Sequence, residues 1–125
     1  MEIRLLLDTN SIIALLNENS EVIEAIDSAE NIFISIINEL EFKSFSGISL
    51  NDIKLFDAFV SNVNVLDLQA SNSTLINKTI EIRNAYKLKL PDAIIAASAI
   101  VNNAVLLTGD KGFKKIEGLQ LSIIE

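Results

Sequence analysis

The chain has 125 residues, with 10 basic and 17 acidic side chains, and its formal net charge is −7. It contains neither histidine nor cysteine, which excludes disulfide frameworks, thiol or Ser–His nucleophiles and the usual zinc ligand sets. Any bound metal ion must therefore be held by oxygen, which favours Mg²⁺ or Mn²⁺. Half of the residues are hydrophobic, and the length predicts a single domain over residues 1–125. Without a membrane-spanning run or a signal peptide, we expect a cytoplasmic protein.

Short apolar runs alternate with helical patterns along the chain. In chain order, we expect a strand at 3–7, helices at 12–16 and 20–29, a strand at 32–34, helices from 35 and over 49–60, a strand at 63–66, a helix over 71–87, a helix from 91, and strands at 104–107 and 119–124. This alternation predicts a three-layer α/β/α fold with a mostly parallel sheet of about five strands. In such sheets the functional crevice lies at the carboxyl ends of the strands.

Four acidic residues are expected near that edge: Asp8, Glu39, Asp92 and Asp110. Three of them have an ordinary structural explanation, because Asp8 and Asp110 are suited to cap a helix or turn and Glu39 to face a helix dipole. Asp92 is harder to explain, because it opens a helix that is apolar nearly all round and an acid there needs a partner. Carboxylates that converge in a crevice repel one another unless a cation neutralises them. The set therefore predicts an Mg²⁺ or Mn²⁺ site.

Four segments together resemble the acidic motifs of PIN-domain ribonucleases, most closely the small toxins of VapBC-type toxin–antitoxin pairs. They are IRLLLDTN (3–10), SIINEL (35–40), PDAIIAASA (91–99) and LLTGDKGF (106–113). The resemblance implies a PIN-like fold in which Asp8, Glu39, Asp92 and Asp110 are the catalytic metal ligands. It also implies that Asn10 and Thr108 steady the site.

By this resemblance, the protein is a metal-dependent endoribonuclease that hydrolyses RNA with a metal-activated water, forms a homodimer and is blocked by a VapB-like antitoxin. Lys111 and Lys114, which follow Asp110, are candidates to touch the RNA backbone. Four phenylalanines of the segment 35–60 either pack in the core or form an apolar groove for the antitoxin. They are Phe42, Phe45, Phe56 and Phe59.

Two other functions remain open. A phosphohydrolase of the haloacid dehalogenase type would use Asp8 as its nucleophile, although it normally has a second acid where this chain has Asn10. The other is a non-catalytic PIN-like module that binds RNA or protein.

Overall fold

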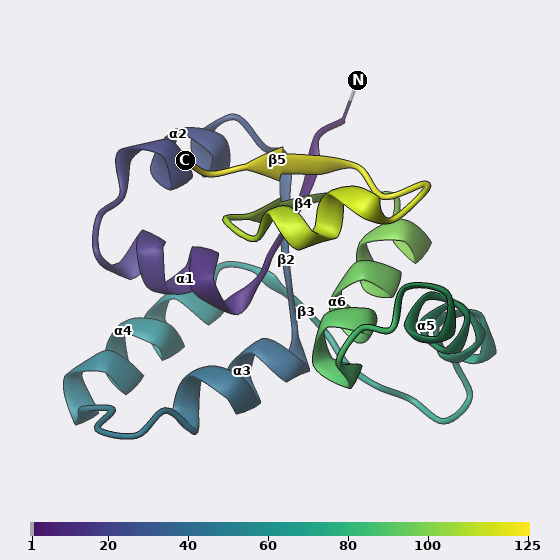
Figure 1. Cartoon of the computed structure of the whole chain (residues 1–125). Helices are drawn as coiled ribbons and strands as arrows, with labels where there is room; N and C mark the ends of the chain where they lie inside the picture. Colours follow the sequence, from purple (N-terminus) through teal and green to yellow (C-terminus); the bar gives the residue numbers. More distant parts are fainter. Residues whose placement is uncertain (1) are drawn as a thin grey trace.

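The computed structural model describes residues 2–125, which form five strands, six α-helices and one 3-10 helix (Figure 1). The elements are β1 (Arg4–Leu7), α1 (Thr9–Leu16), α2 (Ser20–Asp27), β2 (Asn31–Ser35), α3 (Ile36–Lys43), α4 (Leu50–Val60), β3 (Asn64–Leu66), α5 (Ser73–Tyr86), α6 (Leu90–Val101), β4 (Val105–Thr108), η1 (Lys111–Lys115) and β5 (Leu121–Ile123). The expected elements are thus confirmed, with boundaries moved by a few residues. The 3-10 helix η1 was not predicted. Within residues 2–125, no helix combines the length and apolarity that crossing a bilayer requires.

The five strands form one parallel sheet in the order β3-β2-β1-β4-β5. The chain fills one half of the sheet first, from β1 to β3, and then crosses to the other side of β1 to add β4 and β5. The switch point of the topology therefore lies between β1 and β4, where a crevice opens beyond the carboxyl ends of the strands.

Helices cover both faces of the sheet, which confirms the three-layer α/β/α architecture. Along β1, Leu5 and Leu7 point to one face and Leu6 to the other, as the strand period requires. The first face packs against α1 to α4, and the second against α5, α6 and η1 (Figure 1). The N-terminal turns of α1 and α3 and the start of η1 lie at the carboxyl edge of the sheet, because each follows a strand that ends there. The N-terminal turn of α6 lies at the same edge, because this helix runs antiparallel to the strands and leads back to the start of β4.

Candidate active site

Asp8 directly follows the central strand β1 and is almost completely buried, with 8% of its surface exposed. One carboxylate oxygen accepts a hydrogen bond from the amide of Ser11 at 2.8 Å, so that Asp8 caps α1. The other oxygen accepts a hydrogen bond from the hydroxyl of Thr108. The carboxylate, which follows β1, is therefore fixed in orientation by the first turn of α1 and the end of β4.

Asp110 follows β4 and is exposed, and its backbone amide donates to the hydroxyl oxygen of Thr108 at 3.0 Å. The buried Thr108 hydroxyl thus lies between the two acids, donating to Asp8 and accepting from Asp110. The Asp110 carboxylate caps η1 by accepting from the amide of Gly112 at 2.8 Å. A Cβ atom at position 112 would lie only 2.9 Å from that carboxylate oxygen, so glycine leaves the space that the Asp110 carboxylate occupies.

Asp92 lies in the first turn of α6, whose following residues 93–99 are all buried. Burial is the main cause that raises the pKa of the Asp92 carboxyl above its ordinary value, followed by the negative charges of Asp110 and Glu41. The positive charge of Lys89 opposes this rise, and Asp8 adds to it weakly. Asp92 therefore lies in the field of three other carboxylates.

Glu39, the acid expected from α3, does not line the crevice. Its carboxylate pairs with Lys43 one turn further along the helix, at 3.0 Å, and Lys43 also pairs with Asp57 of α4 at 2.8 Å. Hydrogen bonds from Lys43 to Asp57 and then to Glu39 raise the pKa of the lysine. The structure therefore places Glu39 on the side of α3 that faces α4.

Glu41 reaches the crevice in its place, because residues two apart on a helix are turned by about 200° from one another. The carboxylate of Glu41 accepts a hydrogen bond from the hydroxyl of Thr9 at 2.7 Å. The fully buried Asn38 donates to the same hydroxyl oxygen at 3.0 Å and accepts from the amide of Ser35 at 2.7 Å. Asn38, the capping-box partner of Ser35 in α3, therefore also positions Glu41 through Thr9. Glu41 was not among the site residues predicted from the sequence.

These acids share one cavity of about 380 Å³, which we call the acid cleft. It is lined by Asp8, Thr9, Asn10, Glu41, Phe45, Asp92, Ile95, Asp110 and Phe113. Of the residues expected at the site, Asp8, Asn10, Asp92 and Asp110 line this cleft, and Thr108 lies directly behind Asp8. Among residues 2–125, no three acidic side chains are arranged closely enough to hold one metal ion as they stand. The donors nevertheless suit Mg²⁺ or Mn²⁺, because Asp8, Glu41, Asp92 and Asp110 all offer carboxylate oxygens to the same cavity.

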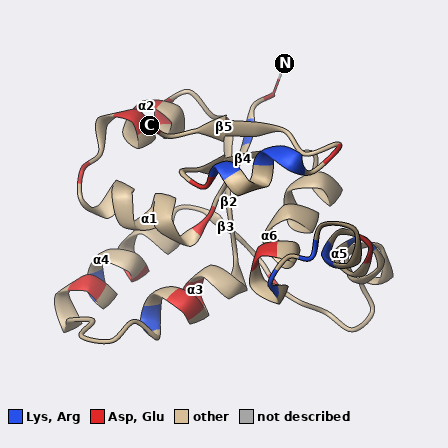
Figure 2. Cartoon of the chain, viewed as in Figure 1, with Lys and Arg blue, Asp and Glu red and all other residues tan. Residues whose placement is uncertain are grey.

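A second cavity, of about 240 Å³, adjoins the acid cleft, and we call it the lysine cleft. It is lined by Lys87, Leu88, Lys89, Asp92, Asp110, Gly112, Phe113 and Lys115. The lysines expected to touch a substrate, Lys111 and Lys114, are exposed on η1 and line neither cleft. Figure 2 shows the basic segments on η1 and on the connection between α5 and α6, beside the acidic start of α6.

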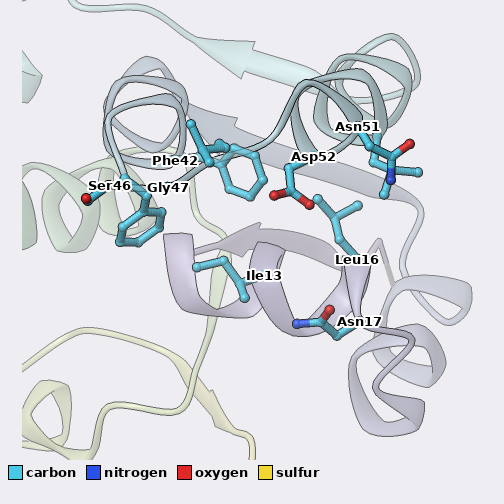
Figure 3. Close-up of a pocket in the computed structure, with 11 residues that line it drawn as sticks. Ile13, Leu16, Asn17, Phe42, Ser46, Gly47, Asn51 and Asp52 are labelled. Atoms are coloured by element: carbon cyan, nitrogen blue, oxygen red, sulfur yellow. The ribbon is translucent and has the colours of Figure 1, made fainter.

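The four phenylalanines divide between the core and the surface. Phe56 and Phe42 are buried and stack with their ring centroids 4.7 Å apart, and Phe59 packs against the same core cluster. Phe45 is 46% exposed. It lines, together with Phe42, a groove of about 480 Å³ between α1 and the α3–α4 hairpin (Figure 3). The core therefore takes Phe42, Phe56 and Phe59, and Phe45 lies on the rim of the groove. That the groove receives an antitoxin stays a prediction.

Comparisons with known proteins agree on one family. Residues 5–119 match the sequence profile of the PIN domain. Comparison with curated proteins found no significant match. Among solved structures, similar chains occur in VapBC2 of Rickettsia felis bound to a promoter DNA fragment (TM-score 0.83, 24% identity, 98% of this chain and 100% of that chain) and in VapBC-1 of nontypeable Haemophilus influenzae (0.80, 26%, 97% and 98%). Another occurs in a toxin–antitoxin complex from Klebsiella pneumoniae (0.74, 28%, 91% and 93%).

The profile match covers most of the chain, and the five-stranded parallel sheet is the fold of these solved structures. The chain therefore belongs to the PIN domain family.

Proposed function

We propose that this PIN-domain protein is a cytoplasmic endoribonuclease that depends on Mg²⁺ or Mn²⁺ and serves as the toxin of a toxin–antitoxin pair. The observation that carries the proposal is the acid cleft, in which carboxylates from four separate elements meet at the switch point of the sheet. In this proposal the metal ligands are Asp8, Glu41, Asp92 and Asp110, with Glu41 replacing Glu39.

A bound divalent cation would supply an activated water and would offset negative charge on the phosphoryl oxygens during hydrolysis. The chain's own residues keep the donors in place. Thr108 and Ser11 hold the Asp8 carboxylate, and Thr9 holds Glu41. Burial raises the pKa of Asp92 most, followed by the negative charges of Asp110 and Glu41, and a cation in the cleft would offset those charges. Because the chain has no histidine or cysteine, neither side chain is available as base or nucleophile.

Two acids of one helix turn provide the sharpest test of the ligand set. Purified wild type, Glu41→Gln and Glu39→Gln are compared in cleavage of a panel of structured RNAs with Mg²⁺, Mn²⁺ or EDTA. Loss of one metal ligand removes several kcal/mol of transition-state stabilisation. We therefore expect the cleavage rate of Glu41→Gln to fall by at least about 100-fold. Glu39→Gln breaks only a partly exposed pair with Lys43, worth under about 1 kcal/mol, and the rate should stay within about twofold of wild type.

The same assay distinguishes other functions. Cutting that persists in EDTA, or in Asp92→Asn, would refute the metal-dependent mechanism. Loss of cutting in Glu39→Gln with activity retained in Glu41→Gln would restore the original ligand assignment. Turnover of a phosphomonoester that is lost in Asp8→Asn would favour a phosphohydrolase, and binding of RNA without any hydrolysis would favour a non-catalytic module.

We further propose that a VapB-like antitoxin occupies the apolar groove. Besides Phe45, the groove presents Leu55, which is 43% exposed, opposite Ile13 of α1. An amphipathic helix from a partner would bury these side chains, and several of the similar structures are complexes of toxin with antitoxin. Leu55→Glu should abolish co-purification with a co-expressed VapB-like antitoxin that binds wild type, and retention of that antitoxin would refute the assignment.

We also propose a homodimer. The outer face of α5 and the start of α6 carry Ile76, Ile80 and Leu90, which are 40%, 52% and 48% exposed around a cavity of about 330 Å³. Clustered apolar side chains of this kind are typical of protein interfaces. Ile80→Glu should shift the mass in light scattering from dimer to monomer, while Leu55→Glu, on the opposite helical layer, should leave it unchanged. A monomeric wild type, or a dimer that survives Ile80→Glu, would refute this interface.

A further inference from the structure

The apolar groove between α1 and the α3–α4 hairpin contains a carboxylate. Among the described residues that line the groove, Asp52 is the one charged side chain. Figure 3 shows its carboxylate between the ring of Phe42 and the side chain of Leu16, directed across the groove towards α1. Apolar side chains make up much of the remaining lining: Ile13, Leu16, Phe42, Phe45, Ile48 and Leu55. A negative charge therefore lies within the surface that a partner would cover with apolar side chains.

The local structure of α4 accounts for one oxygen of this carboxylate. Asp52 lies in the first turn of α4, where Oδ2 accepts from the amide of Ser49 at 3.2 Å and the Asp52 amide donates to Ser49 Oγ at 3.0 Å. Within residues 2–125, Oδ1 has no hydrogen-bond donor, and the ion pairs join other acids. The capping box thus holds the side chain in place and leaves Oδ1 available to a group that enters the groove.

The groove differs in character on the two sides of Asp52. Phe42 and Phe45 lie on one side, with their ring centroids 6.5 Å apart. On the other side, beyond Leu16, lie the exposed amides of Asn17 and Asn51 (Figure 3). Amide groups both donate and accept hydrogen bonds. The lining therefore suits a helix that is apolar over the two phenylalanines and polar over the two asparagines.

An entirely apolar helix would bind poorly over Asp52. It would exclude water from Oδ1 and leave a buried charge without a partner, which is strongly unfavourable. A cation that donates hydrogen bonds to the carboxylate removes this penalty. Arginine is better suited than lysine, because its guanidinium is more weakly hydrated and matches the planar geometry of a carboxylate.

We propose that the helix bound in the apolar groove presents a basic residue, arginine in preference to lysine, to Asp52 from within its apolar face. This proposal rests on the antitoxin assignment above. Apolar residues three or four positions before and after the basic residue share its face of the helix and contact the groove around it. Asp52 is then a specificity-determining residue, because an antitoxin with an apolar or acidic residue at that position leaves the carboxylate unpaired.

A neutral variant tests the charge without disturbing the helix cap. The probe is a co-expressed VapB-like antitoxin that binds wild type, and its affinity for each purified toxin variant is measured by isothermal titration calorimetry in EDTA. Asp52→Asn keeps an oxygen that can accept from the Ser49 amide but loses the charge. Removing one partner of a buried ion pair should weaken antitoxin binding by at least about 30-fold. Glu24→Gln removes a charge from an exposed position on α2 outside the groove, and its affinity should stay within about twofold of wild type.

A charge swap identifies the partner residue. Asp52→Arg should abolish binding of the wild-type antitoxin, and binding should return when one basic residue of the antitoxin, flanked by apolar residues at helical spacing, is changed to glutamate. A double-mutant cycle between Asp52→Asn and the neutral variant of that basic residue should be strongly non-additive. Recovery of binding in the swapped pair also shows that Asp52→Arg folds.

The outcomes separate this inference from the function on which it rests. An affinity of Asp52→Asn within about twofold of wild type, or additive cycles with every basic residue of the antitoxin, would overturn the pairing even if Leu55→Glu abolishes binding. Retention of the antitoxin by Leu55→Glu would instead refute the groove itself. Because no RNA is cleaved in this assay, coupling between Asp52 and a basic residue of the antitoxin would support the inference even in a protein that proves not to be a nuclease.

Discussion

Asn38 joins the start of α3 to the acid cleft, and its replacement should impair stability and activity together. The side chain is fully buried, accepts from the amide of Ser35 at 2.7 Å and donates to the Thr9 hydroxyl at 3.0 Å. The Thr9 hydroxyl in turn donates a hydrogen bond to the carboxylate of Glu41. Asn38→Ala removes both hydrogen bonds and leaves the Ser35 amide without its partner.

The cost follows from these contacts. A buried hydrogen bond contributes about 0.5–1.5 kcal/mol, and an unpaired buried amide costs about 1–3 kcal/mol. We therefore expect Asn38→Ala to lower the free energy of unfolding by about 2–4 kcal/mol, which for a domain of this size corresponds to a fall of about 10 °C in Tm. Asn62→Ala, which removes one exposed hydrogen bond on α4, should change Tm by no more than about 2 °C.

Asn38→Asp separates the two roles of the side chain. Its carboxylate still accepts from the Ser35 amide, so the cap of α3 is retained, but it has no donor for Thr9. The Thr9 hydroxyl can then donate either to the new carboxylate at position 38 or to Glu41, so the orientation of Glu41 is no longer fixed. Loss of a contact that positions a metal ligand typically costs about 10- to 100-fold in activity. Asn38→Asp should therefore cut RNA that much more slowly, although the cap of α3 is retained.

Thermal unfolding followed by circular dichroism, and initial rates of RNA cleavage with saturating Mg²⁺, measure the two effects. A Tm of Asn38→Ala within about 2 °C of wild type would refute the stability reasoning. A wild-type rate in Asn38→Asp would show that Glu41 needs no support from Thr9.

Three further changes act on the two clefts. In metal-free buffer at pH 7, Asp92→Asn should have a higher Tm than wild type, because the pKa of Asp92 is raised in the folded state and its charged carboxylate therefore destabilises the fold. The difference in Tm should disappear as the pH falls towards 3.8, the ordinary pKa of the group, where the carboxylate becomes protonated. A lower Tm of Asp92→Asn at pH 7 would contradict this reasoning. Lys87→Gly should raise the free energy of unfolding in urea by about 0.5–1 kcal/mol, because glycine adopts the left-handed conformation at φ 54° without strain. The same change should weaken RNA binding, because it removes an ammonium group from the lysine cleft. A lower free energy of unfolding would show that Lys87 is not strained. Gly112→Ala should slow cleavage about tenfold with little change in Tm, because its Cβ would displace the Asp110 carboxylate, 2.9 Å away, and an unchanged rate would refute a role for that orientation.

The sheet was predictable because its strands are short apolar runs and its helices have clear caps. Asp8 directly follows β1, Asp110 lies two residues after β4, and Pro91 in the first turn of α6 marks the start of that helix. The order β3-β2-β1-β4-β5 was not predictable, because no local pattern indicates on which side of β1 the later strands are added. The 3-10 helix η1 was missed because a turn of five residues around Gly112 has too few residues for a helical period.

The assignment of the third acid depended on the phase of one helix. The segment Asn38-Glu39-Leu40-Glu41 offers two glutamates, and each lies within the first two turns of a helix that begins after Ser35. The phase follows from the capping box, in which Asn38 turns back to Ser35 and so faces the sheet. Glu41, three residues later, then shares that face, and Glu39 does not. Treating Asn38 as an N-cap partner would have identified Glu41 from the sequence.

The net charge of −7 does not oppose RNA binding, because five of the acids lie outside the acid cleft. They belong to α2 and its flanks: Glu18, Glu21, Glu24, Asp27 and Glu30. Glu30, the last of the five, lies at the amino edge of the sheet, where its amide donates to the carbonyl of Ile3. A strand of four residues separates that edge from the acid cleft by about 13 Å, which exceeds the Debye length of about 8 Å in physiological salt. None of these five acids lines the acid cleft. The charge within it comes from Asp8, Glu41, Asp92 and Asp110, and a bound cation would offset that charge and favour the approach of RNA.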